Sequence, residues 1–149
     1  MKTVRHSLRF QLAALVVVLQ FAGCGAKQTP EDLFREAVCS PIPASVQVIK
    51  ATRKSRSGNI EVWLHFKVSK QDMGAILKSE RYQHLGSSKL NYSAYGPPAW
   101  WTPDELGAGR SCLDCEASPH FGRDRSAKDI ILNEGNNEAF FLLRSWYNY

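Results

Sequence analysis

The segment Cys112-Leu113-Asp114-Cys115 carries the residue types and spacing best suited to chemistry. Two cysteines this far apart occur at thiol–disulfide redox sites, where a strand-to-helix turn lowers the pKa of one thiol. No parallel-strand pattern surrounds this pair, and the carboxylate of Asp114 would raise a neighbouring thiol pKa. In an oxidising compartment the expectation is a structural disulfide between Cys112 and Cys115, with redox activity as an alternative.

Metal and cofactor chemistry fit these cysteines poorly. A haem attachment motif needs histidine directly after the second cysteine, and Glu116 stands there. A zinc site that recruited His120 and Cys39 would match no familiar ligand spacing. The sequence therefore predicts no metal and no cofactor. A second possible bridge joins Cys39 to Cys112 or Cys115 and would close a loop of more than 70 residues.

Two adjacent tryptophans, Trp100 and Trp101, follow the segment Tyr95-Gly96-Pro97-Pro98-Ala99. Tryptophans beside prolines form a rigid aromatic platform that suits stacking on sugars or gripping a proline-rich peptide. The alternative is packing, in which one ring covers the core and the prolines shape the loop. One ring buried and one exposed would satisfy both interpretations.

Basic residues gather near the tip of an expected hairpin, at Lys50, Arg53, Lys54 and Arg56. Such a group contacts anionic lipid headgroups or acidic wall polymers, or forms an ordinary solvated turn. The sequence shows no Ser-His-Asp order, no paired-carboxylate site and no glycine loop for phosphate. We therefore expect no catalytic residue and a function that is not enzymatic.

The first 23 residues have the pattern of an export signal. Three basic residues precede an apolar run from Phe10 to Phe21, which is too short for an ordinary membrane-spanning helix. The run ends in Phe21-Ala22-Gly23-Cys24, with small residues before a cysteine. We predict a signal peptide over 1–23 and a tether over 24–28. Cutting before Lys27, with free secretion, is the alternative.

The segment Phe21-Ala22-Gly23-Cys24 resembles the lipobox of bacterial lipoproteins, although Phe21 stands where leucine is usual. The resemblance implies that Cys24 carries diacylglycerol and that a membrane is the partner of this lipid. Gly25 in place of aspartate implies sorting to an outer membrane, facing the periplasm, where the host has one. The Pro43–Val46 entry to the first strand, the Pro97–Trp101 loop and the terminal hairpin also resemble small bacterial lipoproteins, a resemblance that carries no activity with it.

Composition indicates one globular domain over 29–149, because 126 of the 149 residues remain after the leader. The whole chain has a formal charge of +5, but the mature part has 16 basic and 14 acidic residues. This excess of basic residues is too small for a surface that binds nucleic acid, so no nucleic-acid partner is expected.

The pattern of elements predicts an α+β fold in the order α-β-β-α-loop-β-β. Helix-start residues stand at Thr29–Asp32 and Ser69–Asp72, and the second helix should run to about Tyr82. Strands are expected at Val46–Lys54, Ile60–Val68, Ile130–Leu132 and Ala139–Trp146. Apolar and polar residues alternate in the second strand, whereas the last is apolar at nearly every position and should be central, with both faces covered. Two antiparallel hairpins would then form a small sheet with helix packed on one face.

These observations favour a membrane-anchored envelope lipoprotein with a non-enzymatic binding domain, whose partner is an envelope protein or the cell wall. One alternative is a peptidoglycan- or glycan-binding module that uses Trp100 and Trp101. Another is a periplasmic thiol-disulfide protein that uses Cys112 and Cys115.

Overall fold

The structure is a computed structural model that describes residues 27–79, 82–84, 92–103, 109–115, 125–133 and 135–146. For residues 84 and 109–115 the description covers the backbone alone. The leader and Cys24 lie outside these ranges.

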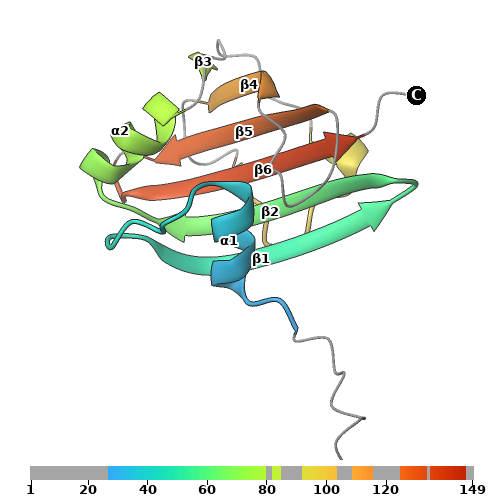
Figure 1. Ribbon diagram of the computed structural model, residues 1–149, viewed down its shortest axis with the longest axis horizontal. Coiled ribbons are helices and arrows are strands. Elements are labelled where there is room, and N and C mark those ends of the chain that lie inside the picture. Colours follow the sequence, from blue (N-terminus) through green and yellow to red (C-terminus); the bar gives the residue numbers. More distant parts are fainter. Residues whose placement is uncertain are drawn as a thin grey trace, which may run out of the picture.

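Six antiparallel strands form one sheet in the order β1-β2-β6-β5-β4-β3. The strands are β1 (Gln47–Arg56), β2 (Asn59–Lys67), β3 (Gln83–His84), β4 (Gly109–Cys115), β5 (Arg125–Asn133) and β6 (Glu138–Trp146). The helices are α1 (Pro30–Ala37), α2 (Lys70–Ser79) and the 3-10 turn η1 (Ser93–Tyr95). Figure 1 shows β1 at one edge of the sheet and β3 with β4 at the other. The α+β class and the antiparallel sheet are confirmed.

The predicted sheet of two hairpins was too small. Both β3 and β4 fall where only a connection was expected, and β5 begins five residues before the predicted strand at Ile130. The cause is composition, because glycine, serine and aspartate in β4 disfavour a strand locally. In β5 the polar side chains of Ser126, Lys128 and Asp129 are buried, so the usual apolar signal is missing. These strands form because they pair with strands that lie far away in the sequence.

Helix α1 starts where the sequence predicts. Thr29 accepts a hydrogen bond from the backbone N–H of Asp32, and the Asp32 carboxylate accepts one from the N–H of Thr29, which completes a capping box. Pro30 occupies the first turn, where a missing N–H has no cost. Leu33, Phe34 and Ala37 are buried against the sheet.

Helix α2 begins at a cap that includes a residue from another part of the chain. The Ser69 hydroxyl accepts from the N–H of Asp72, as expected for a capping box. The reciprocal bond is replaced by Ser45, whose Oγ accepts from the N–H of Ser69 and donates to the Asp72 carboxylate at 2.5 Å. Ser45 therefore connects the start of α2 to the segment before β1.

A two-residue turn joins β1 and β2. Ser57 and Gly58 both have positive φ, at 48° and 82°, between the paired residues Arg56 and Asn59. Positive φ at both central positions is the geometry that matches the twist of a hairpin. The predicted turn is confirmed, and it extends β1 and β2 as one long ribbon.

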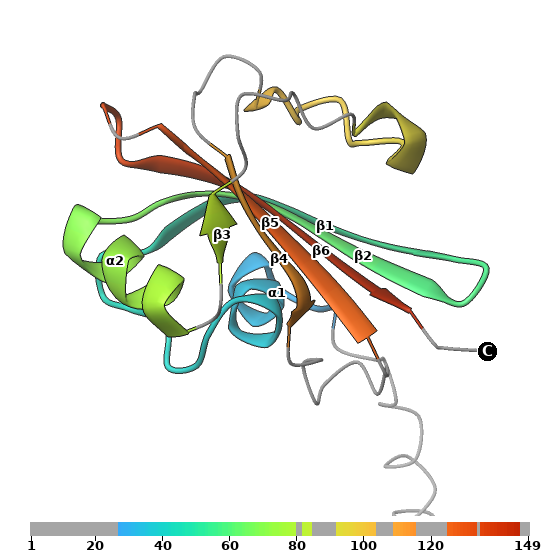
Figure 2. The same cartoon turned by 90° about the horizontal axis from the view of Figure 1, so that it is seen from above.

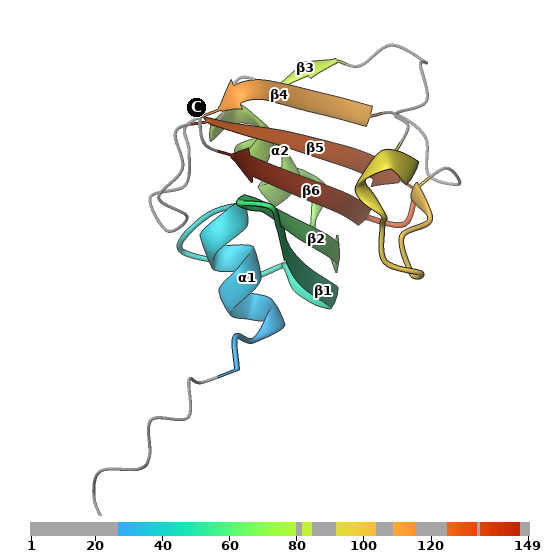
Figure 3. The same cartoon turned by 90° about the vertical axis from the view of Figure 1, so that its right-hand side faces the viewer.

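The sheet has a hydrophobic core on each of its faces. Helices α1 and α2 cover one face, and the segment 92–103 covers the opposite face, as Figure 2 and Figure 3 show. On the helix face Phe34 packs edge-on against Phe66, with ring centroids 4.9 Å apart. Strand β6 lies between β2 and β5 with both faces buried, as predicted. The predicted one-sided covering of the sheet was incomplete, because the connection after α2 returns to cover the second face.

Candidate binding face

The second sheet face carries an aromatic cluster centred on Trp101. We call this surface the loop face: the sheet surface under residues 92–103, together with those residues. The ring of Trp101 makes edge-to-face contacts with Trp63 at 4.7 Å and with Tyr92 and Phe140, each at 5.3 Å. Trp63 is fully buried and Trp101 is 7% exposed. Aromatic pairs in this geometry add stability beyond the area they bury, so the segment is held rigidly on the sheet.

Arg144 of β6 connects this segment to the sheet by polar contacts. Its Nη2 pairs with the Asp129 carboxylate at 2.9 Å, and its Nη1 donates to the Tyr95 hydroxyl at 2.8 Å. The guanidinium also lies 4.7 Å from the centroid of the Tyr95 ring. Asp129 is 2% exposed, so its charge depends on this close partner. The plane of Arg144 thus orients an aromatic ring that is itself 38% exposed.

One further contact fixes an edge of the segment, and another orients Trp63 beneath it. The Lys54 ammonium donates to the carbonyl oxygen of Gly96 and lies 6.0 Å from the Trp63 ring centroid. The Trp63 indole donates to Glu61 at 3.3 Å. Strands β1, β2 and β6 each supply a polar side chain to the same region, so the sheet presents charged groups of both signs beside the aromatic segment.

A hollow of about 250 Å³ opens beside these groups, at the end of the loop face nearest the β1–β2 turn. Its lining combines aromatic rings with amide, carboxylate, guanidinium and hydroxyl groups, from Asn59, Ile60, Glu61, Tyr95, Arg144, Ser145 and Trp146. Such a mixture can stack on a flat ligand and hydrogen-bond to its edges. A second hollow, of about 170 Å³ and mostly apolar, lies between α2 and the end of the β5–β6 hairpin.

No known protein family, curated protein or solved structure matches this chain.

At the other end of the loop face, His65 stacks on Phe140 with ring centroids 4.3 Å apart. Its Nε2 lies 3.7 Å from Glu138, which also approaches Lys67 at 3.8 Å. Burial lowers the pKa of His65 below its ordinary value, and this effect outweighs the opposing pull of the Glu138 carboxylate. The neutral imidazole is thus favoured, and this group packs as an aromatic side chain.

On the loop face, the buried polar atoms without a hydrogen-bond partner among the described residues include Nε1 of Trp101, Nε of Arg144 and Nε2 of His65. Buried N–H groups are normally paired, so these atoms are exceptions within the described part of the chain. Within the described residues no group of three histidine, cysteine or acidic side chains is arranged to hold a metal ion.

The structure separates the two predicted ligand-contact residues. Trp101 is packed in the aromatic cluster and has little surface left for a ligand. Trp100 is only partly buried and lies 6.2 Å from Trp101 between ring centroids. One ring packs and one remains accessible, so the packing interpretation holds for Trp101 and ligand contact stays a prediction for Trp100.

The cysteine pair lies on β4, which is extended and paired with β5. In a regular strand, Cα atoms three residues apart lie about 10 Å from each other, whereas a disulfide joins Cα atoms about 4.4–6.8 Å apart. A bridge between Cys112 and Cys115 therefore needs the irregularity between Leu113 and Cys115 to bring them together. Because their side chains lie outside the description, this disulfide stays a prediction. A strand also differs from the helix start at which redox cysteines are activated.

The remaining predicted positions fall in different places. Cys24 lies outside the described residues, and no helix within them is long and apolar enough to cross a bilayer. Cys39 is half-buried at the end of α1, where it packs against the core. The basic residues Lys50, Arg53, Lys54 and Arg56 all lie on β1, and only Lys54 contacts the loop face through an identified hydrogen bond.

Sequence reasoning missed Arg144, Asp129, Tyr95 and Glu61, which form the polar part of the loop face. The contacts of Arg144 with Asp129 and Tyr95 join residues 15 and 49 positions apart, so no local spacing marks them. A charged residue inside the otherwise apolar Ala139–Trp146 stretch is the one available signal, and it points to Arg144.

Proposed function

We propose that this chain is a membrane-anchored cell-envelope lipoprotein whose folded domain binds another envelope component without catalysing a reaction. The observation that carries the binding role is the loop face, where an accessible aromatic ring lies beside a hollow lined by charged and polar groups. The lipobox-like segment ending at Cys24 supports the anchor, and its sorting residue favours an outer membrane.

The fixed geometry of the loop face supports binding more than a purely structural role. A covering segment needs only apolar contacts to bury the sheet. Here Arg144 orients Tyr95 by a hydrogen bond and by ring stacking, although that ring remains 38% exposed. An exposed aromatic ring held by its surroundings loses little conformational entropy when a ligand stacks on it. The domain thus presents a preorganised contact surface.

In-cell photo-crosslinking tests this proposal. A photoreactive amino acid replaces Ala99, an exposed residue beside Trp100, and a matched variant carries it at the exposed Lys78 of α2. We expect the Ala99 position to form a discrete adduct with an envelope component, and the Lys78 position to form little of it. Equal yields at both positions, or no adduct at Ala99, would contradict a binding role for the loop face.

Glycan binding is the second candidate, and the lining of the hollow favours it. Tyr95 and Trp146 supply aromatic rings, while Asn59 and Glu61 supply an amide and a carboxylate. Sugars present apolar faces that stack on such rings and hydroxyl groups that bond to planar polar side chains. The accessible Trp100 extends the aromatic surface along the loop.

A pull-down with purified peptidoglycan separates this candidate from protein binding. Trp100→Ala and Tyr95→Ala should each reduce the retained fraction several-fold, whereas Lys78→Ala should leave it unchanged. If wild-type protein is not retained, or if all three variants behave like it, glycan recognition by this face is wrong.

A further inference from the structure

The charge of the mature chain is divided unevenly between its two ends. Residues 27–56 contain six basic and three acidic residues, a net charge of +3, whereas residues 57–149 contain ten basic and eleven acidic residues. Strand β1 contributes four of those basic residues and no acidic one. The side chains of Lys50, Arg53 and Arg56 are exposed. Strand β1 is therefore the basic edge of the domain.

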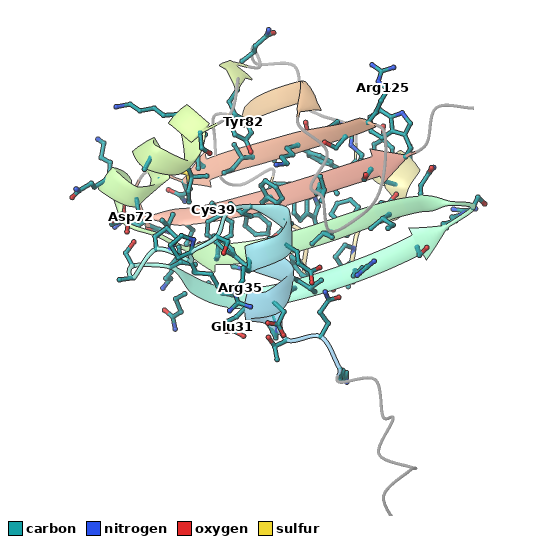
Figure 4. All side chains as sticks on the ribbon, in the orientation of Figure 1. Glu31, Arg35, Cys39, Asp72, Tyr82 and Arg125 are labelled. Carbon is teal, nitrogen blue, oxygen red and sulfur yellow. The ribbon has the colours of Figure 1, made fainter. Side chains whose placement is uncertain are left out.

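The start of the domain is fixed against this same strand. Gln28 accepts a hydrogen bond from Arg53 of β1 at 3.2 Å and donates one to Glu36 of α1 at 2.6 Å. Figure 4 shows Glu31 and Arg35 on the part of α1 next to this start, and Figure 1 shows β1 beside it. Cys24 precedes Gln28 by four residues, so the chain between them can span at most about 14 Å. A lipid on Cys24 would hold β1 close to the headgroups.

Strand β1 also exposes an apolar side chain. The pairing of β1 with β2 is irregular between Val48 and Lys50, and Ile49 at this bulge is 39% exposed. Ile49 and Tyr95 are the large hydrophobic residues exposed in the described part of the chain. Basic residues around an exposed aliphatic side chain are the combination that binds membrane interfaces.

The nearby acidic residues of α1 do not cancel this charge. Asp32 pairs with Arg35 at 2.7 Å, and its pKa is lowered by the hydrogen bonds from Thr29 and by Arg35. Glu36 accepts the hydrogen bond from Gln28. Asp32 and Glu36 are engaged by the helix and its cap, whereas Glu31 is exposed on α1 and Lys50, Arg53 and Arg56 are exposed on β1.

We propose that β1 lies against the anionic headgroups of the membrane that holds the lipid of Cys24, through Lys50, Arg53 and Arg56 and through Ile49 next to Lys50. This orientation rests on the proposed acylation, and it directs the β3–β4 edge away from the membrane. The loop face then stands beside the bilayer, where an envelope partner can reach it.

Vesicle cosedimentation of the processed chain carrying Cys24→Ser measures the electrostatic contact without the lipid. The probe is phosphatidylcholine vesicles with or without 30% phosphatidylglycerol, at low ionic strength. Because each basic residue near an anionic surface changes the partition coefficient about fivefold, Lys50→Gln with Arg56→Gln should weaken binding about 25-fold. The matched control Lys70→Gln with Lys78→Gln removes two exposed charges from α2 and should bind like the parent. Ile49→Ser should weaken binding further, and 0.5 M salt should abolish it.

Equal losses in the two charge variants would show that net charge alone attracts the chain, and would overturn the proposal. So would failure of the parent chain to bind anionic vesicles, including the case in which it binds only a soluble polyanion such as polyglutamate. Palmitate labelling of the chain with Cys24 intact is measured separately. Vesicle binding without labelling would reject the anchor and keep the basic surface, and labelling without vesicle binding would do the reverse.

Discussion

Arg144 is the residue on which the polar side of the loop face depends. It pairs with the almost fully buried Asp129 and orients Tyr95, while its Nε has no hydrogen-bond partner among the described residues. A buried carboxylate that loses its cation keeps its full desolvation cost, which makes the pair strongly coupled. The structural role and the proposed binding role meet in this one side chain.

A double-mutant cycle measures that coupling. Arg144→Gln should lower the free energy of unfolding by about 3 kcal/mol, because it removes the guanidinium that pairs with the buried Asp129 carboxylate. Adding Asp129→Asn should recover part of the loss, giving a coupling energy of about 2 kcal/mol in urea unfolding. If the free-energy losses of the two single variants add up to that of the double variant within about 0.5 kcal/mol, the ion pair does not stabilise the loop face.

His65 makes the stability of the fold depend on pH. Its pKa is lowered in the folded chain from an ordinary value of 6.5, chiefly because burial penalises the charged ring. As the pH falls below about 6.5, the unfolded chain takes up the proton first, so the free energy of unfolding decreases. This loss ends once the pH is below the folded-state pKa. Thermal melts at pH 7.5 and 5.5 should show a smaller decrease for His65→Gln than for wild type, and equal decreases would contradict the assignment.

In strand β2, the alternation of apolar and polar residues predicts one buried face correctly and misses the burial of the other. Ile60, Val62, Leu64, Phe66 and Val68 are all buried on the helix face, as the period of two predicts. The same pattern suggested a solvated second face, yet Trp63 on that face is fully buried. Segment 92–103 covers it from about 30 residues away, and such a return of the chain has no local signature.

Three substitutions on β2 test the two-sided burial. Leu64→Ala should cost about 2–5 kcal/mol, and Trp63→Ala about 3–5 kcal/mol, because each leaves a cavity in one of the two cores. Lys67→Ala at the exposed end should stay within about 0.5 kcal/mol. Urea unfolding of the three variants gives the comparison. A Trp63→Ala variant as stable as Lys67→Ala would mean that the loop face is not packed as described.

Elements with strong local signals could be predicted, and those formed by distant pairing could not. Capping residues predicted α1, and the apolar run predicted β6 as a central strand. The polar sequence of β4 and the buried Asp129 of β5 are stable only because neighbouring strands satisfy them. For the candidate site the same holds, since Trp100 and Trp101 were visible as a motif while Arg144 and Tyr95 meet only in the folded chain.

At the scale of the whole molecule, the proposed anchor, the basic edge and the proposed binding face belong to one arrangement. The described chain begins beside β1, and Cys24 precedes that start by a few residues. Lipid attachment at Cys24 would therefore set the orientation of the domain as well as its location in the cell. Without the lipid, a single basic strand gives only reversible, salt-dependent contact with a membrane.

The most direct test of the central claim is the chemical state of Cys24 in cells. Wild-type protein should incorporate radiolabelled palmitate, and mass spectrometry of its N-terminal peptide should find an acylated Cys24 at the first position. Cys24→Ala should take up no label and should remain uncut or be cut elsewhere. A wild-type product that begins at Lys27 and carries no lipid would contradict the claim that this chain is a lipoprotein.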